Sequence, residues 1–330
     1  GGSTGLRIAL AGGSSAAGVG VDDAQHAAAL LEGAVDGVEV WNLGTPNYGL
    51  EQSWRRLEAF WGVLEPDLVV LEVAPGTDPW QDAEGPGWLR VRDGRLVEAG
   101  WAPSGSPLDP LRRGIHRPLF AHHLPGDGLL WQHSSLYRAG LGVLSRHRMK
   151  QPQPWPWGME PFDGEAFGAV PWLHLAPPPP PIAAAWQVTE AALSRIQALA
   201  ERRGARLLLV SAPSRIEVLS ADLQRALANG WSLGARPGGG SGDGRRAFDP
   251  ELPQATLAAL ATERGIPLLD LRPAFREAAR TERMHYRDIG QRTAGGQREA
   301  ARALGRFVEA QGALTLPPDF DARLDAAVPP

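Results

Sequence analysis

The sequence predicts an α/β protein: a three-layer α/β/α sandwich on a five-stranded, mostly parallel sheet, with one inserted subdomain. Short apolar runs alternate with amphipathic helical segments near both ends of the chain, which is typical of parallel sheets covered by helices. Residues 79–181 interrupt this alternation with a stretch rich in Trp, Gly and Pro. The 330 residues, of which 43% are hydrophobic, suffice for one large domain with a sizeable core.

Three strands and two helices are predicted before residue 78. Residues 6–11 (LRIALA) form an apolar run that stops at Gly12 and Gly13, as a buried strand does when it enters a turn. A helix and a strand then alternate twice, which favours parallel pairing of the strands. The strands of this half are residues 6–11, 38–41 and 67–73, and the helices are residues 22–31 and 50–64.

The same alternation resumes at residue 182. Residues 182–203 place apolar side chains at helical spacing, and residues 206–211 (RLLLVS) form an apolar run of strand length. The glycine-rich residues 234–244 are typical of an exposed loop. The strands of this half are residues 206–211 and 266–271, and the helices are residues 182–203, 221–228, 253–264 and 293–310.

The interruption contains its own local signals. Residues 88–97 alternate around Asp93-Gly94, which predicts a hairpin with a two-residue turn, and residues 129–150 contain a helical pattern. The prolines at 177–181 predict an extended spacer. Most of the twelve tryptophans fall here, where they either dock the segment onto the sheet or line a cleft for a carbohydrate or acyl chain.

These patterns give a prediction of the domain organisation. Residues 6–78 and 182–311 form one core domain, and residues 79–181 form an insertion that lids the site. Residues 1–5 (GGSTG) read as a cloning remnant, and residues 312–330 as a C-terminal tail.

The composition excludes several classes of chemistry. The chain has no cysteine, so disulfides, thiolate metal sites and cysteine nucleophiles are excluded. Lys150 is its only lysine, which argues against Schiff-base and P-loop mechanisms. The net charge of -4 gives no indication of a nucleic-acid surface, and no apolar stretch is long enough to span a membrane. His122, His123 and His133 match no standard ligand spacing, so we expect neither a metal nor another cofactor.

Four short blocks carry a resemblance to a known family. They are residues 9–21 (ALAGGSSAAGVGV), 41–52 (WNLGTPNYGLEQ), 71–78 (LEVAPGTD) and 288–296 (DIGQRTAGG). In order and in position beside strands and helices, they resemble the four blocks of the SGNH/GDSL ester hydrolases. The resemblance covers residues 6–78 and 182–310, and it implies a flavodoxin-like sandwich. Without it, residues 12–18 would be a plain turn of small residues.

The resemblance implies a serine hydrolase that acts on acyl or carbohydrate esters. Ser14 would be the nucleophile, and the oxyanion would be bound by the amides of Ser14 and Gly44 and by the side chain of residue 77. Asp288 would orient the general base at position 291. Without the resemblance, Gly44 would be a plain turn glycine, and Asp288 would cap the turn before the last helix.

Three of these positions depart from the family pattern. Gly13 stands in the place of an Asp, Thr77 in the place of an Asn, and Gln291 in the place of the general-base His. A carboxamide cannot accept the serine proton, and in a serine protease loss of the His costs on the order of 10⁶ in kcat. His285 could substitute if its loop folds back over the site; otherwise it is a loop residue.

The sequence therefore leaves two functions open. The first is an SGNH-type ester hydrolase with Ser14 as nucleophile and turnover impaired at Gln291. The second is an inactive pseudo-hydrolase that binds an acylated or carbohydrate ligand. We expect a soluble protein whose partner is a small-molecule, carbohydrate or lipid ester. Members of the family are often exported, but the sequence decides neither the compartment nor the oligomeric state.

Overall fold

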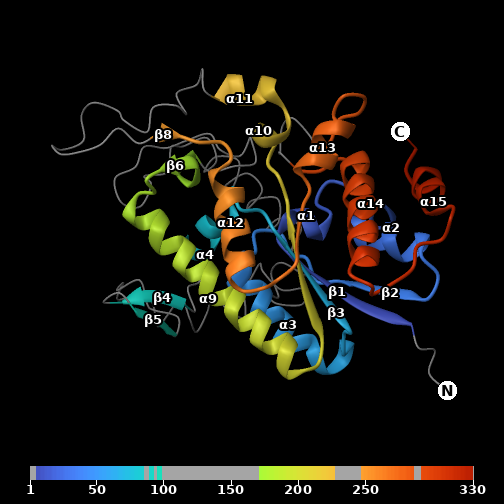
Figure 1. The fold of residues 1–330 in the computed structure, drawn as a ribbon, viewed down its shortest axis with the longest axis horizontal. Coiled ribbons are helices and arrows are strands. Elements are labelled where there is room, and N and C mark those ends of the chain that lie inside the picture. Colours follow the sequence, from blue (N-terminus) through green and yellow to red (C-terminus); the bar gives the residue numbers. More distant parts are fainter. Residues whose placement is uncertain are drawn as a thin grey trace, which may run out of the picture. The chain divides into compact units, whose positions relative to one another are not determined.

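The computed structural model describes residues 5–84, 89–92, 95–98, 171–226, 247–285 and 291–329. Their centre is a five-stranded sheet with the strand order β2-β1-β3-β7-β9, in which every pairing is parallel (Figure 1). The strands are β1 (Leu6–Gly12), β2 (Val38–Asn42), β3 (Leu68–Val73), β7 (Arg206–Ser211) and β9 (Leu268–Asp270).

This strand order confirms the predicted class. It is the doubly wound, flavodoxin-like order, in which the chain first moves to one side of β1 and then crosses to the other. The direction reverses between β1 and β3, and folds of this type bind their ligands outside the strand ends at such a point.

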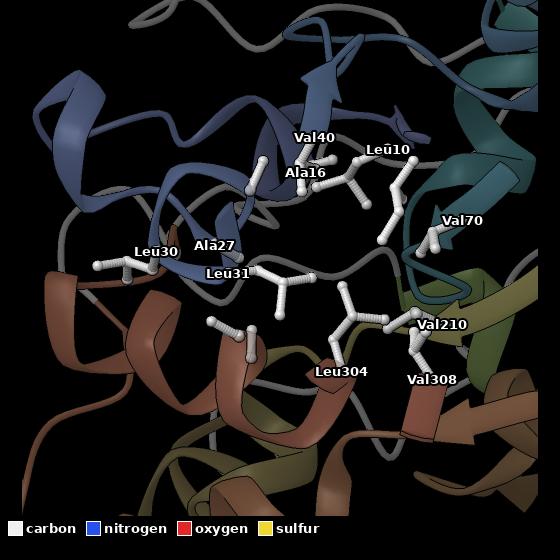
Figure 2. Close-up of a cluster of buried hydrophobic side chains, with 14 of the residues drawn as sticks. Leu10, Ala16, Ala27, Leu30, Leu31, Val40, Val70, Val210, Leu304 and Val308 are labelled. Carbon is white, nitrogen blue, oxygen red and sulfur yellow. The ribbon is translucent and has the colours of Figure 1, made fainter. Parts of the chain in front are cut away.

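Helices cover both faces of the sheet. Strands β1, β3 and β7 bury side chains on both faces, and β3 is buried at all six positions, which explains why its sequence is an almost continuous apolar run. On one face, strand side chains meet those of α2 and α14, among them Leu10, Val70, Leu31, Leu304 and Val308 (Figure 2). The helices of this face are α2 (Ala27–Ala34), α13 (Arg272–Ala278), α14 (Ala294–Ala310) and α15 (Phe320–Ala327), and those of the other are α3 (Leu50–Leu64), α9 (Pro180–Arg202) and α12 (Leu252–Glu263).

Helix boundaries follow local capping where it exists. α3 has the predicted bounds. The helix predicted at 22–31 is instead a 3₁₀ turn at Asp23–Gln25 followed by α2, because the side chain of His26 accepts the amide proton of Ala29 and caps α2. α9 begins at Pro180, inside the predicted spacer, since proline is tolerated in the first turn of a helix.

Residues 312–330 do not form a free tail. They include α15, whose Phe320 and Leu324 are buried in the cluster with α2 and α14. Phe320 packs so closely on Gly305 that a Cβ there would lie 2.5 Å from its ring. The predicted tail is therefore part of the core, and its amphipathic helix is too short to stand out in the sequence.

Parts of the predicted insertion pack with the core. α4 (Asp78–Glu84) contacts α3 and α9, and the strands β4 (Leu89–Arg92) and β5 (Arg95–Glu98) form the predicted antiparallel hairpin. Two short strands, β6 (Leu175–Ala176) and β8 (Ala247–Phe248), also pair. The helix predicted within 129–150, the lid and the loop at 234–244 lie outside the described residues. Two further short helices of the described part are α10 (Arg215–Val218) and α11 (Ser220–Ala226).

None of the helices in the described part of the chain is long and apolar enough to cross a bilayer.

Candidate functional site

The carboxyl ends of β1, β2 and β3 bring three of the predicted site segments to one edge of the sheet. Ser14 begins the one-turn helix α1 (Ser14–Ala17) directly after β1, Gly44 follows β2, and Thr77 follows β3. The loops after β1 and β2 are joined by a hydrogen bond from the Thr45 amide to the Gly12 carbonyl, 3.0 Å long. This edge is also where the strand order reverses, between β1 and β3.

Ser14 is held in a tight turn of small residues. Gly12 lies against β3, where a Cβ would be 2.6 Å from the carbonyl oxygen of Glu72. The hydroxyl of Ser14 accepts a hydrogen bond of 3.2 Å from the amide of Asn47, in the loop after β2. Ser14 is half-buried, so the residue predicted as nucleophile is still partly open to solvent.

Gly44 is required by close packing, but its amide is engaged. A Cβ at this position would lie 2.3 Å from the amide nitrogen of Ala17 in α1. The Gly44 amide donates a 2.9 Å hydrogen bond to Oδ1 of Asn42, two residues earlier. To bind an oxyanion, the Gly44 amide must first be released by rotation of the Asn42 side chain.

Thr77 is also directed toward its own turn. Its hydroxyl lies 3.3 Å from the carbonyl oxygen of Ala74 and 3.3 Å from Oδ1 of Asp78. A hydroxyl has one proton to donate, so either contact occupies the donor that the oxyanion would need.

Position 291 does not provide a base. Gln291 carries a carboxamide, which has neither a carboxylate nor an imidazole to accept a proton. Its Oε1 is buried and has no hydrogen-bond partner among the described residues. The structure therefore shows no bond from this oxygen to Ser14. Asp288, the predicted orienting acid, lies outside the described residues.

His285 is a core residue. It is 3% exposed, and its ring packs at a tilt on Phe275 with centroids 5.7 Å apart. Burial, then the charges of Arg292 and Arg215, lower its pKa to about 3 despite a hydrogen bond to the Pro213 backbone. An imidazole of such low pKa is a weak proton acceptor, and the contacts found for it among the described residues do not include Ser14. The structure gives no support to His285 as a substitute base.

A buried ion pair near the site was not predicted. Nη1 of Arg292 donates to Oε2 of Glu72 across 2.9 Å, and the two side chains are only 1% and 5% exposed. Glu72 stands opposite Gly12 in the β1/β3 pairing. The signal in the sequence is the one acid inside the apolar run LVVLEV, whose partner lies 220 residues away.

Gln297 makes a second contact that was not predicted, to the turn that carries Ser14. It is fully buried in the first part of α14. Its Nε2 donates to the carbonyl of Ser15 at 3.0 Å, and its Oε1 accepts from the amide of Ala27 at 3.2 Å. One side chain thus connects α14, α1 and the start of α2.

Buried carboxyl groups lie next to the turn after β3. Oδ1 and Oδ2 of Asp82 accept hydrogen bonds from the amide of Glu51 at 3.0 Å and the hydroxyl of Thr189 at 2.7 Å. Burial nevertheless raises the pKa of Asp82 to about 7. Burial, with the charges of Asp82 and Glu72, raises the pKa of Asp78 well above its ordinary value.

The part of the chain that the structure describes holds no group of three or more His, Asp or Glu side chains arranged to bind a metal ion. His122, His123 and His133 lie outside that part.

Neither a protein-family model nor a curated protein matches the sequence. Solved structures are similar to it in fold. TesA is 13% identical, with 92% of this chain and 98% of that chain covered and a TM-score of 0.44. A catalytic mutant of Axe2, an acetylxylan esterase from Geobacillus stearothermophilus, is 14% identical, with coverages of 93% and 96% and a TM-score of 0.41. A lipolytic protein of the G-D-S-L family from Veillonella parvula is 10% identical, with coverages of 90% and 95% and a TM-score of 0.40.

With TM-scores of 0.40 to 0.44, these matches carry no argument about the site. At these identities the chemistry of the site has to be argued from its own residues: Ser14, Gly44, Thr77 and Gln291.

Proposed function

We propose that this chain is an SGNH-type serine ester hydrolase of strongly reduced turnover, acting on an acyl or carbohydrate ester with Ser14 as nucleophile. The observation that carries the proposal is the placement of Ser14. It is the second residue after β1, at the edge where the strand order reverses; the residue is half-buried, and its hydroxyl accepts a hydrogen bond from the Asn47 amide. An ordered hydroxyl at such a point suits attack on a bound carbonyl.

The reaction proceeds by covalent catalysis. The Ser14 oxygen adds to the ester carbonyl carbon, and the serine proton passes to the departing alcohol through water. Water then attacks the acyl-serine, releases the acid and restores the Ser14 hydroxyl. The negative oxygen of each tetrahedral intermediate needs donors, which the Ser14 amide provides together with the Gly44 amide once Asn42 has turned away.

Two features account for the low turnover. Gln291 does not titrate near neutral pH, so the serine is not activated by a base. The Gly44 amide and the Thr77 hydroxyl are held by Asn42 and by Ala74 or Asp78, and loss of one oxyanion donor costs on the order of 10²–10³ in rate. When a catalytic triad is broken, substrate binding and the oxyanion hole still give a rate about 10³–10⁴ times that of the reaction in water.

Hydrolysis of nitrophenyl esters tests the proposal. The protein should hydrolyse short-chain esters slowly but measurably faster than a Ser14→Ala variant. Gln291→His should raise kcat strongly, and the gain should disappear when Ser14→Ala or Asp288→Asn is added. Gln197→His, on the helix α9, is the matched control, because it introduces an imidazole away from the proposed site. No Ser14-dependent rate in either background, over several acyl lengths, would refute the proposal.

A binding protein without turnover is the second candidate. It is favoured by the internal hydrogen bonds of the Gly44 amide and the Thr77 hydroxyl, which leave the site closed to an oxyanion. In that case an acyl trifluoromethyl ketone and a non-hydrolysable acyl amide bind with similar affinity, measured by calorimetry. A hydrolase binds the ketone far more tightly, because the ketone forms the tetrahedral adduct with Ser14.

A further inference from the structure

We propose that the buried Glu72–Arg292 ion pair is a positioning device, which fixes the segment bearing residue 291 against the strand ends that carry Ser14. The proposal rests on the function proposed above, because it concerns the geometry between the nucleophile and the base position. The two residues act through Ser14 and residue 291 and do not touch the substrate.

Glu72 lies directly beside the nucleophile turn. It pairs in register with Gly12, two residues before Ser14. The approach is so close that a Cβ at Gly12 would lie 3.2 Å from the Cβ of Glu72. The position of Glu72 is therefore fixed relative to the start of α1.

Arg292 is the neighbour of residue 291 and is held by both its side chain and its backbone. Its guanidinium donates to Glu72 and lies 5.3 Å from the ring centroid of Phe275. Its backbone forms a bridge with His285, and the next amide, of Thr293, bonds to the carbonyl of Met284 at 3.0 Å. Any displacement of Arg292 displaces residue 291 with it.

Stability alone does not account for this pair. Replacing a buried ion pair by apolar side chains of similar volume is often neutral or stabilising, because both charges lose their hydration when buried. Here Nε and Nη2 of Arg292 and Oε1 of Glu72 are also buried and lack hydrogen-bond partners among the described residues. What the pair provides is a directional contact of 2.9 Å between β3 and the base segment, which an apolar contact would not provide.

Among the described residues, Gln297 is a further link between the two segments. It ties α14, which begins two residues after Arg292, to the carbonyl of Ser15. This link stays intact when the ion pair is removed, so α14 should remain docked. The effect of removing the pair should therefore be confined to the few residues around position 291.

The test replaces the pair by apolar side chains, in the double variant Glu72→Leu/Arg292→Met. The matched control is Arg215→Met/Asp222→Leu, which removes an ion pair of 2.9 Å with exposures of only 3% and 5%. Each double variant is made in the wild-type chain and in the Gln291→His chain. Glu72→Gln, which is isosteric and removes only the charge, is the second variant, and it decides the question by the same measurements should the double variant not fold.

The first measurement is native-state hydrogen exchange, which needs no activity. Without the pair, the Thr293 amide should exchange about tenfold faster or more, while the Val70 amide in the sheet keeps its protection. The control should leave both amides unchanged. An unchanged Thr293 amide in the folded double variant would overturn the proposal.

The second measurement is the hydrolysis of nitrophenyl acetate in the Gln291→His chain. Loss of the pair should lower kcat about a hundredfold with little change in KM, since a displacement of about 1 Å can cost that factor. A change in KM alone, or an equal loss in the control, would count against positioning. If neither the wild-type chain nor the Gln291→His chain has Ser14-dependent activity, the proposed function fails, and the exchange of Thr293 still decides the role of the pair.

Discussion

Substitution of Asp82 is the most direct test of the raised pKa values of the buried carboxyl groups. Its carboxyl is 1% exposed and joins α4 to α3 and α9 by accepting from the Glu51 amide and the Thr189 hydroxyl. In Asp82→Asn, Oδ1 can still accept from Glu51, and the new amide can donate to the Thr189 oxygen. The substitution therefore removes a titrating group while keeping the shape and the hydrogen bonds.

The sign of the effect follows from the raised pKa. Burial raises the pKa of Asp82 from 3.8 to about 7, so the folded state retains a proton that the unfolded state loses above pH 3.8. The contribution of Asp82 to the free energy of unfolding therefore falls between pH 4 and pH 7 and then stays constant. At 1.36 kcal/mol per pH unit, the full cost is on the order of 4 kcal/mol above pH 7. About 2–3 kcal/mol of it develops between pH 5 and pH 8.

Urea unfolding followed by tryptophan fluorescence measures this cost. Asp82→Asn should be more stable than the wild type at pH 8, and the difference should shrink by about 2–3 kcal/mol at pH 5. Burial lowers the pKa of His174 and His285 to about 4 and about 3, and their effects cancel in the comparison. Asp23→Asn, at an exposed acid, is the control substitution. A difference that stays constant from pH 5 to pH 8 would refute the reasoning.

The remaining predictions concern packing. Gly44→Ala should lower the free energy of unfolding by several kcal/mol and disturb α1, because its Cβ would meet the backbone of Ala17. Gly62→Ala, in open space on α3, should raise that free energy by about 0.5–1 kcal/mol. Thermal unfolding compares the two variants. Leu324→Ala in α15 should cost about 2–5 kcal/mol by urea unfolding, since this side chain is fully buried; a cost near zero would show that α15 is not docked. Gln297→Leu should destabilise by about 1–3 kcal/mol and lower the rate at which Ser14 reacts with a fluorophosphonate, whereas an unchanged rate would show that Gln297 does not hold the nucleophile turn.

Local pattern was enough to predict most of the sheet and its helices. Residues 6–11 and 206–211 are strands buried on both faces, so each appears in the sequence as a short run that is more apolar than the residues around it. The turn at Ser14 was predictable for the same reason, since it follows directly where such a run ends. α15 and α2 were missed or shifted because a short docked helix and a histidine cap leave little periodic signal.

The site could be predicted only in its position along the chain. The four blocks place Ser14, Gly44 and Thr77 at one edge of a parallel sheet, and the structure brings them there. Whether their donors are free was not predictable, because the Gly44 amide is engaged by a neighbouring side chain through a rotamer that no sequence pattern specifies.

By itself, the sequence determined the fold class, the succession of strands and helices along the chain and the residue types available for catalysis, because these follow from local periodicity and composition. It also determined that position 291 carries no titratable base. Only the tertiary structure decided that Glu72 meets Arg292, that His285 is buried with a pKa of about 3, and that Asp82 retains a proton near neutral pH. The reason is physical: burial and partners distant in sequence set the energies of charged groups, and both exist only once the chain is folded.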